Sequence, residues 1–138
     1  MDSQYRQLFA DFMESEDTLR VYRGGEPVFI SGQDRLLPIM EYLGKPYTGG
    51  KVTIFDKIMG NAAALLAVKA HGKEVYSPLG SEIAAGTLKK FDIPFHLTEI
   101  VPFIQRPEGG MCPMEEMSLG KSPEEFYIAL KALIEAKT

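Results

Sequence analysis

A two-glycine turn, Gly24-Gly25, constrains the fold of this chain more than any other feature of its sequence. Consecutive glycines tolerate the positive φ angles of a tight hairpin turn, and the stretches on both sides, residues 18–23 and 26–31, carry strand-forming residues. The register follows from the turn, because a two-residue loop fixes which residues face each other. It predicts that Arg23 faces Glu26, Val21 faces Val28 and Leu19 faces Ile30, with the four aliphatic side chains on one face.

Helix and strand patterns alternate along the rest of the chain. Apolar spacing predicts helices over residues 3–15, 33–43, 60–70 and 81–90, and strand patterns occupy residues 51–55, 74–76 and 95–101. The expected inward residues are Leu36, Leu37, Met40 and Leu43 in the second helix and Ala84, Leu88 and Phe91 in the fourth. A short helical turn begins at Cys112-Pro113, and Ser122-Pro123-Glu124-Glu125 is a capping box that begins a last helix.

This order of elements predicts an α/β fold built on one five-stranded mixed sheet. Right-handed crossovers make the last three strands parallel. Pro27 has no N–H to donate, which places the second hairpin strand at an edge of the sheet. The expected strand order is 2-1-3-4-5, with helices on both faces, in a three-layer α-β-α architecture. We expect residues 1–138 to form one domain with an extra C-terminal helix.

The composition excludes several classes of function. The chain has 15 Lys and Arg against 19 Asp and Glu, a net charge of −4, so no nucleic-acid partner is expected. No apolar stretch approaches a membrane span and no signal peptide is recognisable, which predicts a cytoplasmic protein without a membrane partner. One cysteine and two histidines are few metal ligands, so neither a metal nor a cofactor is expected. We interpret His71 as a surface residue at a helix end and His96 as a hydrogen-bonded strand residue.

Three segments carry a resemblance to a known family. They are Tyr22-Arg23-Gly24-Gly25, Asp56-Lys57-Ile58-Met59-Gly60-Asn61-Ala62-Ala63-Ala64 and Gly110-Met111-Cys112-Pro113-Met114-Glu115. In this order they resemble the domain-of-unknown-function family numbered 1893, over roughly residues 16–120. The resemblance implies a cytidine deaminase-like fold. It implies no reaction.

The parent fold allows a test for deamination. Zinc deaminases carry a His or Cys with a Glu two residues on, after the hairpin, and Pro-Cys-x-x-Cys at the next strand-to-helix turn. Here the two corresponding segments, residues 31–35 and 55–61, contain neither His nor Cys. Cys112 lies after the fifth strand, precedes its proline and has no second cysteine nearby. We therefore expect a zinc-independent protein.

The best candidate site lies at the carboxyl end of the third strand, where open α/β sheets bind their ligands. Asp56 can orient a ligand or accept a proton there, or it can cap the next helix. Lys57 can hold an anion or stay solvated, and Asn61 can hydrogen-bond a base edge or a carbonyl. Gly60 can allow the close approach of a ligand. The favoured interpretation is that Gly60 and the alanines after it let the helix pack closely on the sheet.

Two further segments supply candidate site residues. Ser81 is first a helix cap and second a ligand contact, and Glu82 is a possible general base. Cys112 is either a buried structural residue or a nucleophile or redox thiol, with Asp56 or Glu82 assisting. Glu115 and Glu116 are interpreted as first-turn acids that complement a helix dipole.

Three hypotheses follow for the function. The first is a small-molecule binding domain, with a nucleotide-like ligand suggested by the resemblance alone. The second is a non-zinc enzyme that uses Cys112. The third is a regulatory or interaction module working as a homo-oligomer, the commonest kind of protein assembly.

Overall fold

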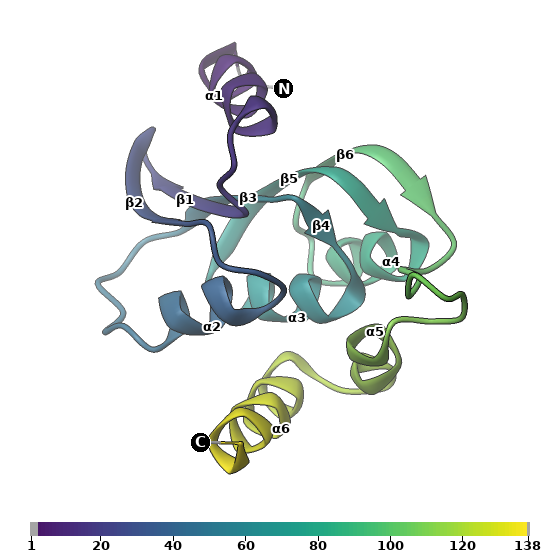
Figure 1. The fold of residues 1–138 in the computed structure, drawn as a ribbon. Coiled ribbons are helices and arrows are strands. Elements are labelled where there is room, and N and C mark those ends of the chain that lie inside the picture. Colours follow the sequence, from purple (N-terminus) through teal and green to yellow (C-terminus); the bar gives the residue numbers. More distant parts are fainter. Residues whose placement is uncertain (1–2, 138) are drawn as a thin grey trace.

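The computed structural model describes residues 3–137, which form six helices and a six-stranded sheet (Figure 1). In chain order the elements are α1 (Ser3–Glu14), β1 (Leu19–Arg23), β2 (Glu26–Ser31), α2 (Leu37–Leu43), β3 (Val52–Asp56), β4 (Ile58–Met59), α3 (Asn61–Lys69), β5 (Gly72–Ser81), α4 (Glu82–Lys90), β6 (Phe95–Val101), α5 (Pro113–Ser118) and α6 (Pro123–Ala136). No helix in this range is long and apolar enough to cross a membrane.

The sheet has the predicted strand order. β2 lies at an edge and pairs antiparallel with β1, which pairs antiparallel with β3. β3 and β5 are parallel, and so are β5 and β6. The short strand β4 pairs with Leu79 and Gly80 of β5, which also pair with β6. It therefore lies on the side of β5 where β3 ends, and the mixed sheet gains one strand that the sequence did not predict.

The predicted hairpin register is wrong beyond the turn. Arg23 does face Glu26, but a β-bulge follows, so that Tyr22 pairs with Pro27 and Val21 pairs with Phe29. Val28 has no partner in the register. A bulge on an edge strand changes which side chains point inward. Here it turns Phe29 onto the core, where its ring lies 5.6 Å from Tyr42, and it leaves Val28 and Ile30 39% and 51% exposed.

Several element boundaries differ from the predicted ones. α2 begins at Leu37, because Arg35 adopts a positive φ of 61° and Pro38 suits a first helical turn. Its buried residues are Pro38 and Ile39, whereas Leu37 is exposed. The strand predicted over residues 74–76 is much longer in the structure, where β5 continues to Ser81.

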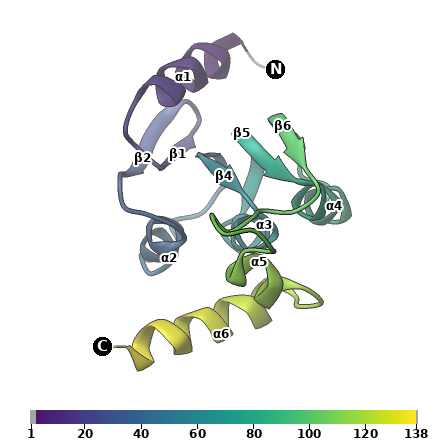
Figure 2. The ribbon, with the colours of Figure 1, turned by 45° about the vertical axis from the view of Figure 1, so that its right-hand side comes forward.

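Helices cover the two faces of the sheet unequally (Figure 2). On one face α1 alone packs its aromatic residues on the sheet, in a cluster that consists of Tyr5, Phe9, Phe12, Tyr22, Phe55 and Tyr76. On the other face α2, α3 and α4 form a layer, and α5 and α6 lie beyond it against α3 (Figures 1 and 2). The expected three layers are therefore present, with α5 and α6 added outside them.

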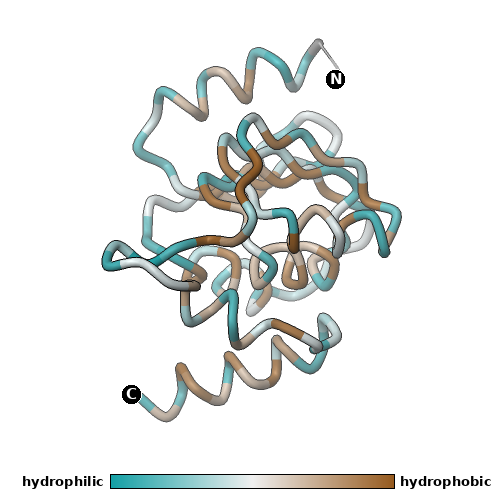
Figure 3. The backbone as a smooth tube through the Cα atoms, turned by 90° about the vertical axis from the view of Figure 1, so that its right-hand side faces the viewer, coloured by the Kyte–Doolittle hydropathy of each residue, from teal (hydrophilic) through white to brown (hydrophobic). Residues whose placement is uncertain are grey.

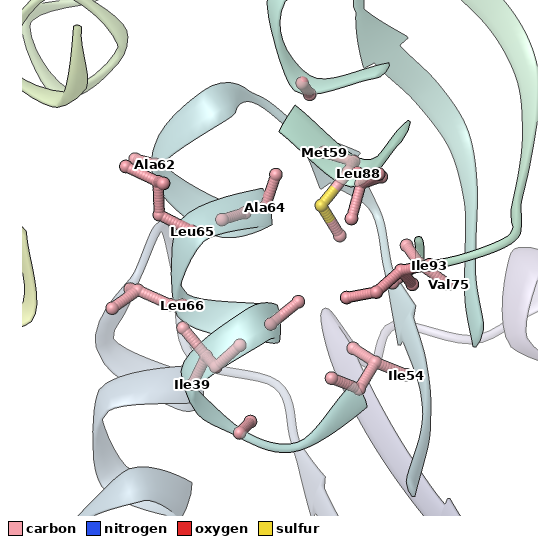
Figure 4. Packing of buried hydrophobic residues seen from close by; sticks show 14 of the residues in the cluster. Ile39, Ile54, Met59, Ala62, Ala64, Leu65, Leu66, Val75, Leu88 and Ile93 are labelled. Carbon is pink, nitrogen blue, oxygen red and sulfur yellow. The ribbon is translucent and has the colours of Figure 1, made fainter. Parts of the chain in front are cut away.

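α3 lies at the centre of the larger core. Its residues from Asn61 to Ala67 are all buried, and the alanines allow close contact with its neighbours. Leu65 and Leu66 of α3, Ile54 of β3 and Leu88 of α4 fill this core (Figure 4). Hydrophobic segments gather in the sheet and the central helices, whereas the loops and the outer helices carry hydrophilic stretches (Figure 3). Phe91, the C-cap residue of α4, is 37% exposed, contrary to expectation, and Ile93 beyond it is buried instead.

Candidate functional site

A cleft of about 710 Å³ opens at the carboxyl end of β3. Three segments far apart in the sequence form its walls: residues 34–36 before α2, residues 56–60 after β3, and the segment from Ile104 to Glu115. Asp56, Lys57, Gly60 and Cys112 all line it. The structure therefore brings four of the seven predicted site residues to one cavity.

Asp56 supplies a buried carboxyl group to this cleft. The residue is only 8% exposed, and one carboxylate oxygen, Oδ1, accepts a hydrogen bond of 3.3 Å from the backbone N–H of Ile58. Burial raises the pKa of the Asp56 carboxyl from 3.8 to about 7, although the backbone N–H groups of Ile58 and Lys57 act in the opposite direction. Asp56 does not cap α3, whose N-cap is Gly60. Near neutral pH this group can therefore donate or accept a proton.

The amine of Lys57 is engaged elsewhere. Its Nζ donates a hydrogen bond of 2.7 Å to the backbone carbonyl of Ser15, just after α1. It also lies 4.7 Å from the ring centroid of Phe12, within the range of a cation–π interaction. Lys57 thus lines the cleft while its charge holds the end of α1 against the sheet.

Gly60 is required by a close approach within the protein. A Cβ atom at this position would lie 3.0 Å from Cγ1 of Ile104 and 3.3 Å from Oε1 of Glu115. Both neighbours belong to the segment that forms the third wall of the cleft. The packing interpretation of Gly60 is therefore the one that its surroundings support.

Glu115 has a structural role in this region that its place in the sequence does not predict. Its side chain is 2% exposed and accepts hydrogen bonds from the backbone N–H of Asn61, from Oγ of Ser81 at 3.3 Å and from the backbone N–H of Ile104 at 2.6 Å. It does lie in the first turn of α5, as expected, but it serves the N-termini of α3 and α4. The only sequence signal was its place after Cys112-Pro113, and helical periodicity alone assigns such an acid to solvent.

Asn61 and Ser81 lie in the same buried network rather than on the cleft surface. The Asn61 amide nitrogen donates a 3.0 Å hydrogen bond to Oγ of Ser118, and its Oδ1 accepts one from Thr87. Ser81 caps α4 as predicted, accepting a 3.0 Å hydrogen bond from the N–H of Ala84. Glu82 is exposed and is not among the residues that line the cleft. These three residues thus stand apart from the cavity.

Cys112 lies at the rim as the N-cap residue of α5. Its backbone N–H donates a 2.7 Å hydrogen bond to the carbonyl of Ile104, while its sulfur makes no capping bond. The side chain is a free thiol of intermediate exposure. It is therefore not the fully buried residue that one of the two sequence interpretations expected.

Sequence reasoning missed two cations of the cleft, Arg35 and Arg106. Arg35 precedes α2 with a positive φ of 61°, and Arg106 lies in the loop closed by the hydrogen bond from its own N–H to the carbonyl of Gly110. Neither residue belongs to a motif, so no sequence pattern points to them. Within residues 3–137, no group of three or more His, Cys, Asp or Glu side chains is arranged to hold a metal ion.

The comparisons with known proteins concern the family and the fold. The family model described as "Domain of unknown function (DUF1893)" matches residues 9–134. The crystal structure of a DUF1893 family protein, TM1506 from Thermotoga maritima, is similar with a TM-score of 0.85 and 24% sequence identity, over 96% of this chain and 90% of that chain. No curated protein matches the sequence. The chain therefore belongs to the DUF1893 family.

Proposed function

We propose that this protein binds a small organic molecule in the cleft at the carboxyl end of β3, without zinc. The observation that carries the proposal is the convergence of Asp56, Gly60 and Cys112, from two separate segments, on one cavity of about 710 Å³. This volume falls in the range of about 300–1,000 Å³ that is typical of small-molecule sites. The cavity also lies where open α/β sheets usually bind their ligands.

The lining has the mixture of groups that such sites use. Leu36, Ile58, Ile104 and Met114 offer apolar surface. Asp56, with its pKa raised to about 7, can donate a hydrogen bond to a ligand when neutral and accept one when charged. The arginine side chains at residues 35 and 106 add donors with fixed geometry for an acceptor group on the ligand.

The first ligands to test are nucleobases, nucleosides and nucleotides. We propose that the strand order and the helix arrangement make this a cytidine deaminase-like fold, and the ligand class is an analogy from that fold. The two segments in which zinc deaminases keep their metal ligands contain neither His nor Cys here, so the proposal involves no metal.

A thermal-shift panel tests the proposal. A ligand that binds only the folded state raises the melting temperature, and at a hundred times its Kd it adds about 2.7 kcal/mol of stability. Asp56→Asn keeps the shape of the side chain but cannot ionise, so it should weaken or abolish the shift for any ligand that contacts this carboxyl. Lys73→Gln, at an exposed position outside the cleft, is the control. If no compound in a broad panel stabilises the wild-type protein, the proposal fails.

Cys112 favours a second candidate function, a non-zinc enzyme. A free, half-buried thiol lines the same cavity as a carboxyl group that titrates near neutral pH. A thiolate nucleophile with a proton acceptor in the same site is the basis of thiol catalysis. Iodoacetamide should then label the native protein at pH 7 at least as fast as the unfolded chain. Since Cys112 is the only cysteine, mass spectrometry reads this directly, and slow labelling would exclude the thiol as a nucleophile.

A further inference from the structure

A second pocket, of about 520 Å³, lies at the other end of α3 from the cleft. It is formed by the end of the hairpin at Arg23, the end of α2, the loop at residues 45–48 and the end of α3 at residues 69–71. We propose that this pocket binds the oxyanion group, phosphate or carboxylate, of a small molecule, with Arg23 as the main contact. The inference concerns a different site from the proposed function and does not depend on it.

The charges that line this pocket are all of one sign. Arg23, Lys45 and Lys69 line it together with His71, and none of the lining residues is an Asp or a Glu. The chain as a whole carries a net charge of −4, so a purely basic lining goes against its composition. Such a concentration of positive charge in a concave surface attracts anions.

The charge of Arg23 is not neutralised by the acidic side chains near it. Lys69 is paired with Glu124 of α6, at 2.7 Å between Nζ and Oε2. Arg23 faces Glu26 across the hairpin, but no ion pair of Arg23 is present in the described part of the chain. Lys45 lies over the ring of Phe29, at 5.7 Å from its centroid, which does not neutralise its charge.

The guanidinium group of Arg23 gives the strongest support. Its Nε atom is buried and has no hydrogen-bond partner among residues 3–137. Buried donors without an acceptor are rare in native proteins, because they lose their hydration without replacement. A rotation of the Arg23 side chain turns Nε toward the pocket, where an oxyanion supplies that acceptor, and the planar fork of Arg can bind phosphate or carboxylate through two parallel hydrogen bonds.

The C-terminal end of α3 acts against an anion, and its effect has to be weighed. A helix C-terminus carries roughly half a negative charge, which is screened by solvent. Lys69 in the last turn is already paired with Glu124, but the backbone carbonyls of Leu66 and Val68 are occupied by the N–H groups of Ala70 and His71. Arg23 and Lys45 together therefore outweigh the helix end.

The rest of the lining indicates that the oxyanion is part of a larger molecule. A volume of about 520 Å³ is in the range of small-molecule sites and exceeds what a bare anion fills. Tyr47 stacks on His71 with 4.1 Å between the ring centroids, and its hydroxyl donates a 3.1 Å hydrogen bond to the carbonyl of Gly50. These rings, with Tyr42 and Val28, provide a surface for the organic part of the ligand.

Isothermal titration calorimetry of the full chain with inorganic phosphate, pyrophosphate and citrate tests the proposal. We expect saturable binding of at least one of these probes with a stoichiometry of one. If phosphate or pyrophosphate binds more tightly than citrate, the oxyanion is a phosphate, and if citrate binds more tightly, it is a carboxylate. Arg23→Gln and Lys45→Gln should each weaken binding by roughly tenfold or more, since a hydrogen bond to a charged group is lost. Lys73→Gln, at an exposed position that lines neither cavity, should leave the affinity unchanged. Arg106→Gln, in the cleft at the other end of α3, shows whether the probe binds there instead.

Three results would overturn the proposal. They are the absence of saturable binding by all three probes, binding that neither Arg23→Gln nor Lys45→Gln weakens, and binding that only Arg106→Gln weakens. Circular dichroism melting of each variant shows whether it folds. Should Arg23→Gln not fold, Lys45→Gln decides, because Lys45 is an exposed residue whose replacement leaves the core intact.

Discussion

The side-chain carboxylate of Glu115 accepts a hydrogen bond from the backbone N–H of Asn61, the first residue of α3 and 54 positions earlier in the chain. The same carboxylate accepts hydrogen bonds from Ser81, the N-cap of α4, and from the N–H of Ile104. One buried acid thus joins two helix N-termini to the segment that forms the third wall of the cleft. A carboxylate is favoured there because helix N-termini present unpaired N–H groups and partial positive charge.

Replacing Glu115 with Ala should strongly destabilise the fold. The change leaves the buried donors of Asn61, Ser81 and Ile104 without an acceptor, at about 1–3 kcal/mol for each unsatisfied group. We expect the free energy of unfolding in urea to fall by about 3–5 kcal/mol. Glu116→Ala is the matched control, since the neighbouring side chain is exposed and should change stability by less than about 0.5 kcal/mol. Equal losses in the two variants would contradict this role of Glu115.

The raised pKa of Asp56 predicts a pH dependence of stability. Its folded-state pKa of about 7 lies above the unfolded value of 3.8, so the folded protein binds this proton more tightly than the unfolded chain does. Below pH 3.8 both states are protonated and Asp56 costs nothing. As pH rises toward 7 the unfolded chain gains stability by ionising, and above 7 the full cost of the buried charge, roughly 4 kcal/mol at most, is present.

Asp56→Asn isolates this contribution, because every other titrating group is common to both proteins. Urea unfolding at pH 5 and pH 8 should show that the variant gains stability relative to the wild type as pH increases. Parallel stability profiles across that range would mean that the pKa of Asp56 is not raised by burial.

Gly60 and Gly86 offer a pair of glycine substitutions with opposite expected signs. Gly60→Ala adds a Cβ atom 3.0 Å from the side chain of Ile104 and 3.3 Å from that of Glu115, so the cleft wall must shift. We expect a loss of about 1–3 kcal/mol. Gly86→Ala lies inside α4 with nothing within 4 Å and should stabilise by about 0.5–1 kcal/mol. Chemical denaturation of both variants checks this, and a neutral Gly60→Ala would show that the wall is loosely packed.

Phe9 tests whether α1 is an integral part of the fold. Its ring lies 5.5 Å from those of Phe55 and Tyr76, measured between centroids, and the residue is 5% exposed. Truncation to Ala should cost about 3–5 kcal/mol in thermal or urea unfolding. Met13→Ala, on the same helix but 43% exposed, should cost far less. A small effect of Phe9→Ala would mean that α1 contributes little to holding the sheet.

The order and type of the main elements could be predicted because they depend on local signals. The Gly24-Gly25 turn, the edge position of Pro27 and the capping box at Ser122 each need only a few neighbouring residues, and all three are present as predicted. The bulge at Val28 cannot be predicted from neighbouring residues alone, because it depends on the packing of Phe29 against Tyr42 of α2. Boundaries set by Arg35 at positive φ or by the two-residue strand β4 carry no periodic signal.

The candidate site was partly predictable for the same reason. Asp56 was found because strand ends can be located from the sequence and ligand sites of α/β sheets lie there. The partner of Asn61 could not be found, since it is an acid on a short helix that periodicity assigns to solvent. Arg35 and Arg106 reach the cleft only through the path of two irregular loops. Residues that reach the site through long-range contacts of loops could not be predicted, because such contacts leave no periodic pattern in a single sequence.

The most direct test of the binding cleft is a titration of the ¹⁵N-labelled protein followed by ¹H–¹⁵N correlation spectra, using the best stabilising compound from the thermal-shift panel. The proposed function predicts that backbone amide signals of residues 56–60 and 104–115 shift in a saturable manner, and that Asp56→Asn weakens the affinity. Saturable shifts confined to the pocket around Arg23 and His71 at the other end of α3, with residues 56–60 unaffected, would contradict it.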